Sequence, residues 1–298
     1  MPIERLILLT GGTGQIGWEL RRELAPLGRV VAPGRDVLDL ARPETLRETI
    51  RRLRPDLVVN AAAYTAVDRA ESEPDECYAI NATGPGVLAE EAARLKAVLV
   101  HYSTDYVFDG VKRSPYLESD ATGPLGVYGR SKLEGDRSVL AASGRCLVLR
   151  TGWVYGLRGK NFFRTILRLA RERAELRVVD DQIGAPTWCR QLASATAQLL
   201  GQDPGVERPG LYHITAGGQT SWYGFAEAIL RLDPRGDEQV CRTVHPIPTS
   251  EYPTPAARPA WSVLSCEKLA TAFRLRLPTW DVQLEMMMEE RAESGHRA

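Results

Sequence analysis

Short apolar runs that alternate with amphipathic segments restrict the first half of the chain to one class of fold. Five such runs predict strands at 6–10, 29–33, 57–62, 98–103 and 146–151. The segments between them have apolar residues at helical spacing and predict helices at 15–26, 43–54, 75–95 and 129–143. Continuous apolar strands that alternate with helices are typical of a parallel sheet covered on both faces. The sequence therefore predicts an α/β fold with a doubly wound, Rossmann-like parallel sheet.

This regularity weakens after residue 152. We expect a dinucleotide-binding domain at 1–152 and, over 153–298, mainly a smaller C-terminal substrate-binding lobe. Sheet elements near 176–201 and 210–216 are expected to return to the first domain. Further helices are predicted at 160–174, 190–201, 221–232 and 280–293.

Composition excludes several classes of partner. Acidic and basic residues balance at 38 each, so we expect no nucleic-acid and no membrane partner. No stretch approaches the ~20 apolar residues of a membrane span. The first apolar run has about six residues and ends in glycines, which is too short for a signal peptide, so we expect a cytoplasmic protein. The five cysteines lack metal-ligand spacing and are expected to be reduced.

A glycine-rich loop follows the first predicted strand and opens the first predicted helix. The sequence TGGTGQIG at 10–17 has the spacing GxxGxxG. Glycine permits a tight turn and lets backbone N–H groups approach a pyrophosphate at a helix N-terminus. The order strand, loop and helix favours dinucleotide binding over a ligand-free turn. The spacing GxxGxxG differs from the GxGxxG of most two-domain dehydrogenases and favours the short-chain dehydrogenase/reductase group. Predicted cofactor contacts are Gly11, Gly14, Gln15, Ile16 and Gly17.

The end of the second strand is expected to distinguish the two nicotinamide cofactors. An arginine there suits the 2′-phosphate of NADP, whereas an acid accepts from the 2′-OH of NAD. Arg35 favours NADPH, while Asp36 leaves NADH possible. Either residue could instead be a solvated loop charge. We expect Arg35, Asp39 and Leu40 to line the cofactor.

Three alanines follow the third strand. Their small side chains leave room for a cofactor to lie across the carboxyl edge of the sheet, although alanine also packs well against helices. The residues are Ala61, Ala62 and Ala63.

Tyr128 and Lys132 have the spacing Y-x-x-x-K at the start of a predicted helix, which places both on one face. Reducing a carbonyl with hydride requires a proton for the developing alkoxide. A tyrosine phenol can supply it if its pKa of about 10 is lowered. An ammonium nearby favours the phenolate, and Lys132 can also bond the nicotinamide ribose.

A hydroxyl at the end of the fourth strand could complete this set. Ser103 or Thr104 could hydrogen-bond the substrate carbonyl, and strand alternation lets only one of them face the cofactor. Glycine loop, hydroxyl and Tyr/Lys pair occur in the order that a nicotinamide-dependent carbonyl reductase requires.

Six blocks of sequence resemble the dTDP-4-dehydrorhamnose reductase family, an extended short-chain dehydrogenase/reductase family. The blocks lie in order along nearly the whole chain, at 60–71, 101–110, 124–136, 150–156, 180–187 and 257–269. The resemblance implies an oxidoreductase of dTDP-rhamnose biosynthesis that reduces the C4 ketone of dTDP-4-dehydro-L-rhamnose to dTDP-L-rhamnose with NADPH.

The resemblance also implies site residues. It selects Thr104 over Ser103 and makes Thr104, Tyr128 and Lys132 the catalytic set. Arg258 is the candidate for the substrate diphosphate, because a guanidinium can bind phosphate through two hydrogen bonds. The alternative for Arg258 is a salt bridge that closes the lobe. The residues implied around the deoxysugar and nucleotide are Thr65, Val67, Thr104, Asp105, Tyr106 and Trp153.

The chain departs from the family pattern in two places. Some members carry glutamates that assemble a magnesium-linked dimer interface, and the matching positions here are Gln15, Arg190 and Glu290. An arginine would repel a divalent cation, so we expect no magnesium site and no homodimer through a carboxylate–magnesium interface. Gly126 stands where the pattern PLNVYG has asparagine.

Two other functions compete with this interpretation. A nucleotide-sugar 4-epimerase or dehydratase would hold NAD tightly, and a dehydratase would carry an Asp-Glu pair where this chain has Asp105-Tyr106. A non-catalytic, NADP-binding regulatory subunit is the second alternative. The intact Thr104, Tyr128 and Lys132 set argues against it.

Overall fold

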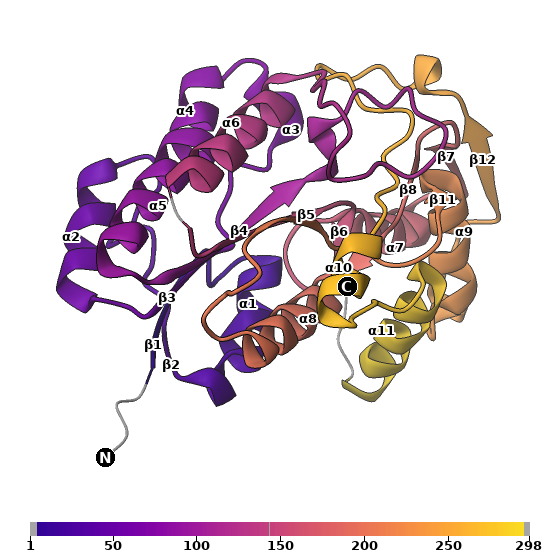
Figure 1. Ribbon diagram of the computed structural model, residues 1–298. Coiled ribbons are helices and arrows are strands. Elements are labelled where there is room, and N and C mark those ends of the chain that lie inside the picture. The colour runs from indigo at the N-terminus through magenta and orange to yellow at the C-terminus, as the bar shows by residue number, and fades with distance from the viewer. Residues whose placement is uncertain (1–4, 143, 295–298) are drawn as a thin grey trace.

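The structure is a computed structural model, and it describes residues 5–142 and 144–294 (Figure 1). Its main sheet has six parallel strands in the order β10-β5-β4-β3-β1-β2. This confirms the predicted α/β fold class. The strands are β1 (Leu6–Thr10), β2 (Arg29–Val31), β3 (Leu57–Asn60), β4 (Val98–Thr104), β5 (Cys146–Thr151) and β10 (Gly210–His213).

Helices cover both faces of this sheet because its strands are apolar on both sides. Along β1, Leu8 packs into the core under α2, α5 and α6, whereas Ile7 and Leu9 pack toward α1 and α8. Figure 1 shows the two groups on opposite sides of the sheet. Their bounds are α1 (Gln15–Glu23), α2 (Pro43–Leu53), α5 (Gly84–Leu95), α6 (Val127–Ala142) and α8 (Cys189–Gln202).

The helix predicted at 75–95 is interrupted. It consists of α4 (Pro74–Tyr78), a π-helical turn η2 (Ala79–Thr83) and α5. Within the turn, Asn81 is buried and its side-chain amide pairs with both the N–H and the C=O of Tyr64. The turn thereby links the helix to the segment after β3. That segment contains a short helix, α3 (Val67–Ala70), which the sequence pattern does not predict. Position 143, the last of the helix predicted at 129–143, lies outside the described residues.

The smaller lobe has its own core, in which Tyr155, Phe163 and Phe225 are buried. Its longer elements are α7 (Phe162–Glu172), β7 (Glu175–Val179), α9 (Trp222–Leu232), β12 (Thr243–Ile247) and α11 (Trp280–Ser294). Helix α10 (Glu267–Phe273) instead packs against the main sheet beside β10, because Leu269 and Phe273 belong to the core of that sheet. Two-stranded sheets join β6 (Val154–Tyr155) to β9 (Thr187–Trp188) and β8 (Ile183–Gly184) to β11 (Thr220–Ser221). Single 3-10 turns are η1 (Ala25–Leu27), η3 (Asp105–Val107), η4 (Gly236–Glu238) and η5 (Thr249–Glu251).

One part of the expected domain arrangement is wrong. The strand at 176–179 does not return to the main sheet, because β7 pairs in parallel with β12 instead. Its apolar residues Leu176 and Val178 belong to the core of the smaller lobe, beneath α7 and α9. By contrast, β10 lies beside β5 in the main sheet, and α8 packs against it with α1. In the described part of the chain, no helix has the length and apolarity to span a bilayer.

Candidate active site

The glycine loop between β1 and α1 is packed so closely that its glycines cannot be replaced without movement. Gly11 has a φ of +67°, and a Cβ there would lie 2.7 Å from the backbone nitrogen of Ala62. A Cβ on Gly17 would lie 2.0 Å from the carbonyl oxygen of Gly11. Gly14 caps α1 without a side-chain hydrogen bond. The first N–H groups of α1 are thus open to an anion such as a pyrophosphate.

The three predicted alanines lie directly beside this loop. Ala62 donates its N–H to Thr10 Oγ1 at 3.3 Å, which holds the segment after β3 against the end of β1. Ala61 and Ala62 pack into opposite cores of the sheet, and Ala63 follows them. The loop and the alanines therefore form one small-residue surface at the carboxyl edge.

The residues predicted around the cofactor ribose fall into two groups. Arg35 is 66% exposed and forms ion pairs with Asp39 at 3.3 Å and Glu76 at 3.2 Å. Asp39 also accepts from the N–H of Ala41, so it holds the loop after β2 in place. Leu40 is buried in the core. Arg35 is thus available at the surface, whereas Leu40 can reach a ligand only through its backbone.

The structure brings Thr104, Tyr128 and Lys132 together. Thr104 ends β4, and the other two lie on the first turns of α6. The Thr104 hydroxyl accepts from the N–H of Tyr106, donates to Asp105 Oδ1 and lies close enough to the Tyr128 phenol to lower its pKa. The Tyr106 ring meets Tyr128 edge to face, with centroids 5.6 Å apart. Of the two hydroxyls left open by the sequence, that of Thr104 faces Tyr128.

The electrostatics of Tyr128 differ from the expectation. Burial raises the pKa of its phenol, and the neighbouring Thr104 hydroxyl only partly opposes this. The Nζ of Lys132 donates to the carbonyl oxygen of Tyr102 at 2.6 Å and faces His101 on β4. Burial in turn lowers the pKa of Lys132 to about 8. Because the pKa of the Tyr128 phenol is raised above 10, the phenol stays protonated at neutral pH.

Of the residues implied around the deoxysugar, Asp105 and Tyr106 adjoin this set. Asp105 is buried, and burial raises the pKa of its carboxyl to about 6. Its Oδ2 has no hydrogen-bond partner within the described ranges. Thr65 is exposed, and its carbonyl accepts from the N–H of Val67 at the start of α3. Tyr106 is partly buried over Tyr128.

Trp153 adopts an unusual conformation beside an aromatic partner that the sequence did not identify. Its φ is +49°, a backbone angle that residues other than glycine rarely adopt. The indole stacks on Trp222 with centroids 3.4 Å apart and an interplanar angle of 3°. Gly184 makes room, because a Cβ there would lie 2.3 Å from the Trp153 ring. The two tryptophans are 69 positions apart, and only the fold places them together.

Arg258 connects the two parts of the molecule. Its Nη2 donates to Asp68 Oδ2 at 2.9 Å on α3, and its Nη1 donates to the carbonyl oxygen of Ala256. It also lines a cavity of about 650 Å³ in the smaller lobe, together with Trp222 and Tyr252. The salt bridge that closes the lobe is thus formed, and the same guanidinium borders a space large enough for part of a nucleotide.

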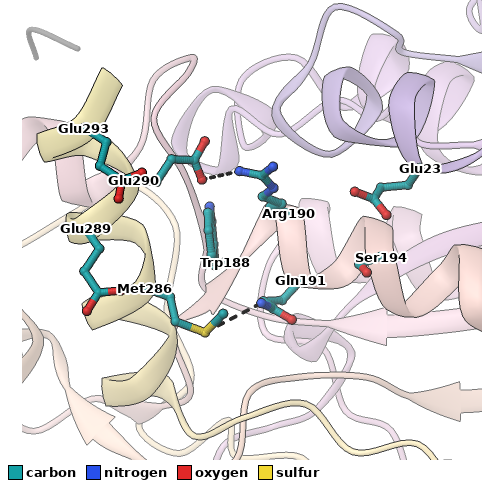
Figure 2. A pocket seen from close by; sticks show the side chains of 9 residues that line it. All are labelled: Glu23, Trp188, Arg190, Gln191, Ser194, Met286, Glu289, Glu290 and Glu293. Carbon is teal, nitrogen blue, oxygen red and sulfur yellow. Dashed lines mark hydrogen bonds and ion pairs between the residues drawn. The ribbon is translucent and has the colours of Figure 1, made fainter. Parts of the chain in front are cut away.

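Two of the positions that match the magnesium-linked interface, Arg190 and Glu290, line a separate pocket of about 370 Å³ (Figure 2). In it, Arg190 on α8 forms an ion pair with Glu290 on α11. Gln15 instead accepts from Asn161 Nδ2 at 2.7 Å. Across residues 5–142 and 144–294, no three His, Cys, Asp or Glu side chains are grouped to hold a metal ion. The absence of a magnesium site stays a prediction.

Gly126, the second departure from the family pattern, has a local explanation. Glu71 accepts from the N–H of Val127 at the start of α6, at 2.8 Å. A Cβ at Gly126 would lie 2.6 Å from the same carboxylate oxygen. Glycine therefore lets Glu71 cap the helix that carries Tyr128.

Comparison with known proteins places this geometry in a family. The model of the family described as "RmlD substrate binding domain" matches residues 5–293. A dTDP-4-dehydrorhamnose reductase of Burkholderia thailandensis is 52% identical and covers 92% of this chain and 95% of its own. One of Escherichia coli is 46% identical, with 95% and 97% covered.

A solved structure agrees with these relatives. A dTDP-4-dehydrorhamnose reductase of Bacillus anthracis in complex with NADP has a TM-score of 0.90, is 33% identical and covers 97% of this chain and 100% of its own. The chain belongs to the dTDP-4-dehydrorhamnose reductase family.

Proposed function

We propose that this protein reduces the C4 ketone of dTDP-4-dehydro-L-rhamnose to give dTDP-L-rhamnose, with NADPH as the preferred reductant. The observation that carries the proposal is the cluster of Thr104, Tyr128 and Lys132 at the carboxyl edge of the sheet. It lies beside a glycine loop in a chain that matches named reductases over nearly its full length. We expect the protein to act in the cytoplasm, and a homodimer is compatible with this function.

The residues present fit a dinucleotide. The glycine loop forms a cradle that a Cβ at Gly11 or Gly17 would fill, and the uncapped N-terminus of α1 suits the pyrophosphate. Arg35 is exposed where a 2′-phosphate would lie, which favours NADPH, although Asp36 leaves NADH possible. When bound, NADPH supplies the hydride for C4 of the sugar.

Side chains of the protein then protonate O4 of the sugar and stabilise the negative charge that develops there. Tyr128 holds its proton at neutral pH and delivers it to O4 as negative charge develops there. Thr104 hydrogen-bonds the same oxygen and stabilises that charge. Lys132, on the same helical face, can reach the nicotinamide ribose. Asp105, Tyr106 and Trp153 position the deoxysugar, with Thr65 and Val67 at its margin, and Arg258 binds the diphosphate.

The test is to generate dTDP-4-dehydrorhamnose enzymatically and to follow NADPH oxidation by the purified protein. We expect turnover that depends on both substrates and a product that co-elutes with dTDP-L-rhamnose. Stoichiometric, tightly bound NAD without NADPH consumption would instead indicate an epimerase. NADPH binding without turnover in the wild-type protein would indicate the regulatory role.

A further inference from the structure

A row of buried polar side chains crosses the sheet and ends at Lys132. Thr10, Asn60 and His101 are direct cross-strand neighbours on β1, β3 and β4. Thr10 Oγ1 donates to Asn60 Oδ1 at 2.6 Å, and Asn60 Nδ2 lies 2.9 Å from His101 Nδ1. His101 Nε2 lies 3.4 Å from Lys132 Nζ. All four side chains are at most 2% exposed, so water does not compete for these contacts.

The contacts fix which nitrogen of His101 carries the proton. Thr10 Oγ1 accepts from the N–H of Ala62, so its own hydrogen goes to Asn60 Oδ1. The remaining side of the Asn60 amide, Nδ2, is a donor, and His101 Nδ1 must accept from it. Burial, with the charge of Lys132, holds the pKa of His101 well below its usual value of 6.5, so the ring is neutral. A neutral imidazole has one N–H, and it therefore lies on Nε2.

This arrangement acts on the charge of Lys132. An N–H on Nε2 cannot accept from an ammonium, whereas it can donate to the lone pair of a neutral amine. Lys132 Nζ in turn donates to the carbonyl oxygen of Tyr102. The Nε2–H thus favours the neutral amine, and the nearby carboxylate of Asp136 favours the ammonium.

Other titratable groups face Lys132 from each element packed around it. Asp136 lies one turn along α6, with its Oδ1 4.0 Å from His101 Nε2 and its Oδ2 3.0 Å from Nε of Arg150 on β5. Cys77 on α4 acts on Lys132 in the same direction as Asp136. Tyr128 lies one turn earlier on α6. Arg150 and Lys132 both face the carboxylate of Asp136. Because one carboxylate is shared between two cations, the position of the proton on His101 affects whether Lys132 is charged.

We propose that His101 is a positioning residue that, held as its Nε2–H tautomer by Asn60 and Thr10, sets the pH at which Lys132 becomes charged. The inference rests on the proposed function, in which Lys132 serves the catalytic set. Thr10 immediately precedes Gly11, so the same row connects Lys132 to the loop proposed to bind the cofactor.

The charge of Lys132 can be measured without substrate. The chain has only five lysines, so protein labelled with ¹³C at the lysine ε-carbons gives five resonances, and Lys132→Arg identifies one of them. Titration of wild type is expected to give Lys132 a pKa of about 8. In His101→Gln the amide oxygen can accept from the ammonium. In Asn60→Leu the imidazole is free to place its proton on Nδ1, so Nε2 can accept. Both variants are expected to raise the Lys132 pKa by about one pH unit.

His213→Gln is the matched control. His213 is also buried and neutral, with its pKa lowered to about 3 mainly by burial, but its Nδ1 contacts the carbonyl oxygen of Tyr116. The Lys132 resonance should titrate in this variant as in wild type. If Asn60→Leu does not fold, Thr10→Val breaks the row at its far end and is expected to shift Lys132 in the same direction.

Three results would overturn the whole proposal, and a fourth would overturn the fixed tautomer within it. The three are an unchanged Lys132 pKa in both variants, a fall in either of them, or an equal rise in the His213→Gln control. A rise in His101→Gln without one in Asn60→Leu would overturn the fixed tautomer.

A second readout separates this inference from the proposed function. The rate of NADPH oxidation is expected to fall on the alkaline side as Lys132 loses its proton, and this limb should move upward with the Lys132 pKa in both variants. If the resonance moves and the rate profile does not, the inference about His101 holds and the proposed role of Lys132 is overturned. If no turnover occurs at all, the resonance still decides the inference.

Discussion

At the scale of single residues, Tyr128 is an acid whose surroundings oppose its ionisation. Burial raises the pKa of the phenol, and the neighbouring Asp105 carboxylate raises it further. A proton donor in such a place keeps its proton until negative charge develops on the acceptor. This suits a reaction in which hydride arrives first at carbon and the oxygen becomes basic only in the transition state.

Replacing Tyr128 tests this role. Tyr128→Phe is expected to lower kcat by about 10²–10⁴-fold, because a positioned proton donor contributes about that much, and to leave the Kd for NADPH unchanged. Steady-state rates and a fluorescence titration measure the two quantities. Tyr102→Phe is the control, since it removes a buried hydroxyl that bonds Thr196 and keeps the carbonyl that accepts from Lys132. Equal losses in both variants would contradict the assignment.

Asp105 gives a prediction on stability. Its folded-state pKa of about 6 lies above the usual 3.8, so the folded protein holds this proton more tightly than the unfolded chain. Stability is therefore lost as the pH rises from about 4 through about 6. Asp105→Asn removes the charge, so it should match wild type near pH 4 and exceed it near pH 8 by up to about 3 kcal/mol.

Denaturant unfolding of the ligand-free protein at the two pH values measures this difference. Asp109→Asn provides the contrast, because the hydrogen bond from Tyr116 lowers the pKa of Asp109. That variant should be less stable than wild type near pH 8, and the difference should shrink in acid. An Asp105→Asn variant that is destabilised at pH 8 would refute the argument.

At the scale of elements, the glycine loop depends on backbone contact more than on flexibility. A methyl group on Gly17 would overlap the carbonyl of Gly11, so Gly17→Ala must push the loop away from α1. We expect the Kd for NADPH to rise at least about tenfold, because the helix N-terminus and the loop no longer share one anion site. Gly236→Ala is the control, since no atom lies within 4 Å of a Cβ there. Calorimetric titration of both variants with NADPH gives the comparison.

The local pattern of apolar residues predicted the strands that are apolar on both faces. It failed where the structure depends on residues that are far apart in the sequence. The strands β1, β4 and β5 follow from continuous apolar runs. The π-helical turn at η2 could not be predicted, because its residues continue the helical spacing and only Asn81, bound to Tyr64, reveals the change. The pairing of β7 with β12 also depends on partners about 70 residues apart.

The candidate site divides in the same way. Tyr128 and Lys132 share a helix, so their spacing alone places them together. The partner of Trp153 and the row of buried polar side chains that ends at Lys132 come from separate strands and helices. No periodicity within one segment reports such contacts.

At the scale of the whole molecule, Arg258 and Asp68 join the C-terminal segment to α3. Partly exposed ion pairs contribute little to stability, so we expect Asp68→Asn and Arg258→Met each to cost less than about 1 kcal/mol. Arg258→Met should also raise the KM for the nucleotide sugar at least about tenfold, because it removes the proposed diphosphate ligand. Asp68→Asn should not, because it leaves the guanidinium in place. Equal KM values in the two variants would mean that the pair serves only to close the lobe.

The stacked pair of Trp153 and Trp222 gives the molecule an internal optical reporter. Two indoles in face-to-face contact quench each other and share their excited states. One belongs to the segment after β5 and the other begins α9 in the smaller lobe. A ligand that slid between them, or a rotation of that lobe, would change the ultraviolet emission of the unlabelled protein. Stopped-flow fluorescence could therefore time substrate entry separately from hydride transfer.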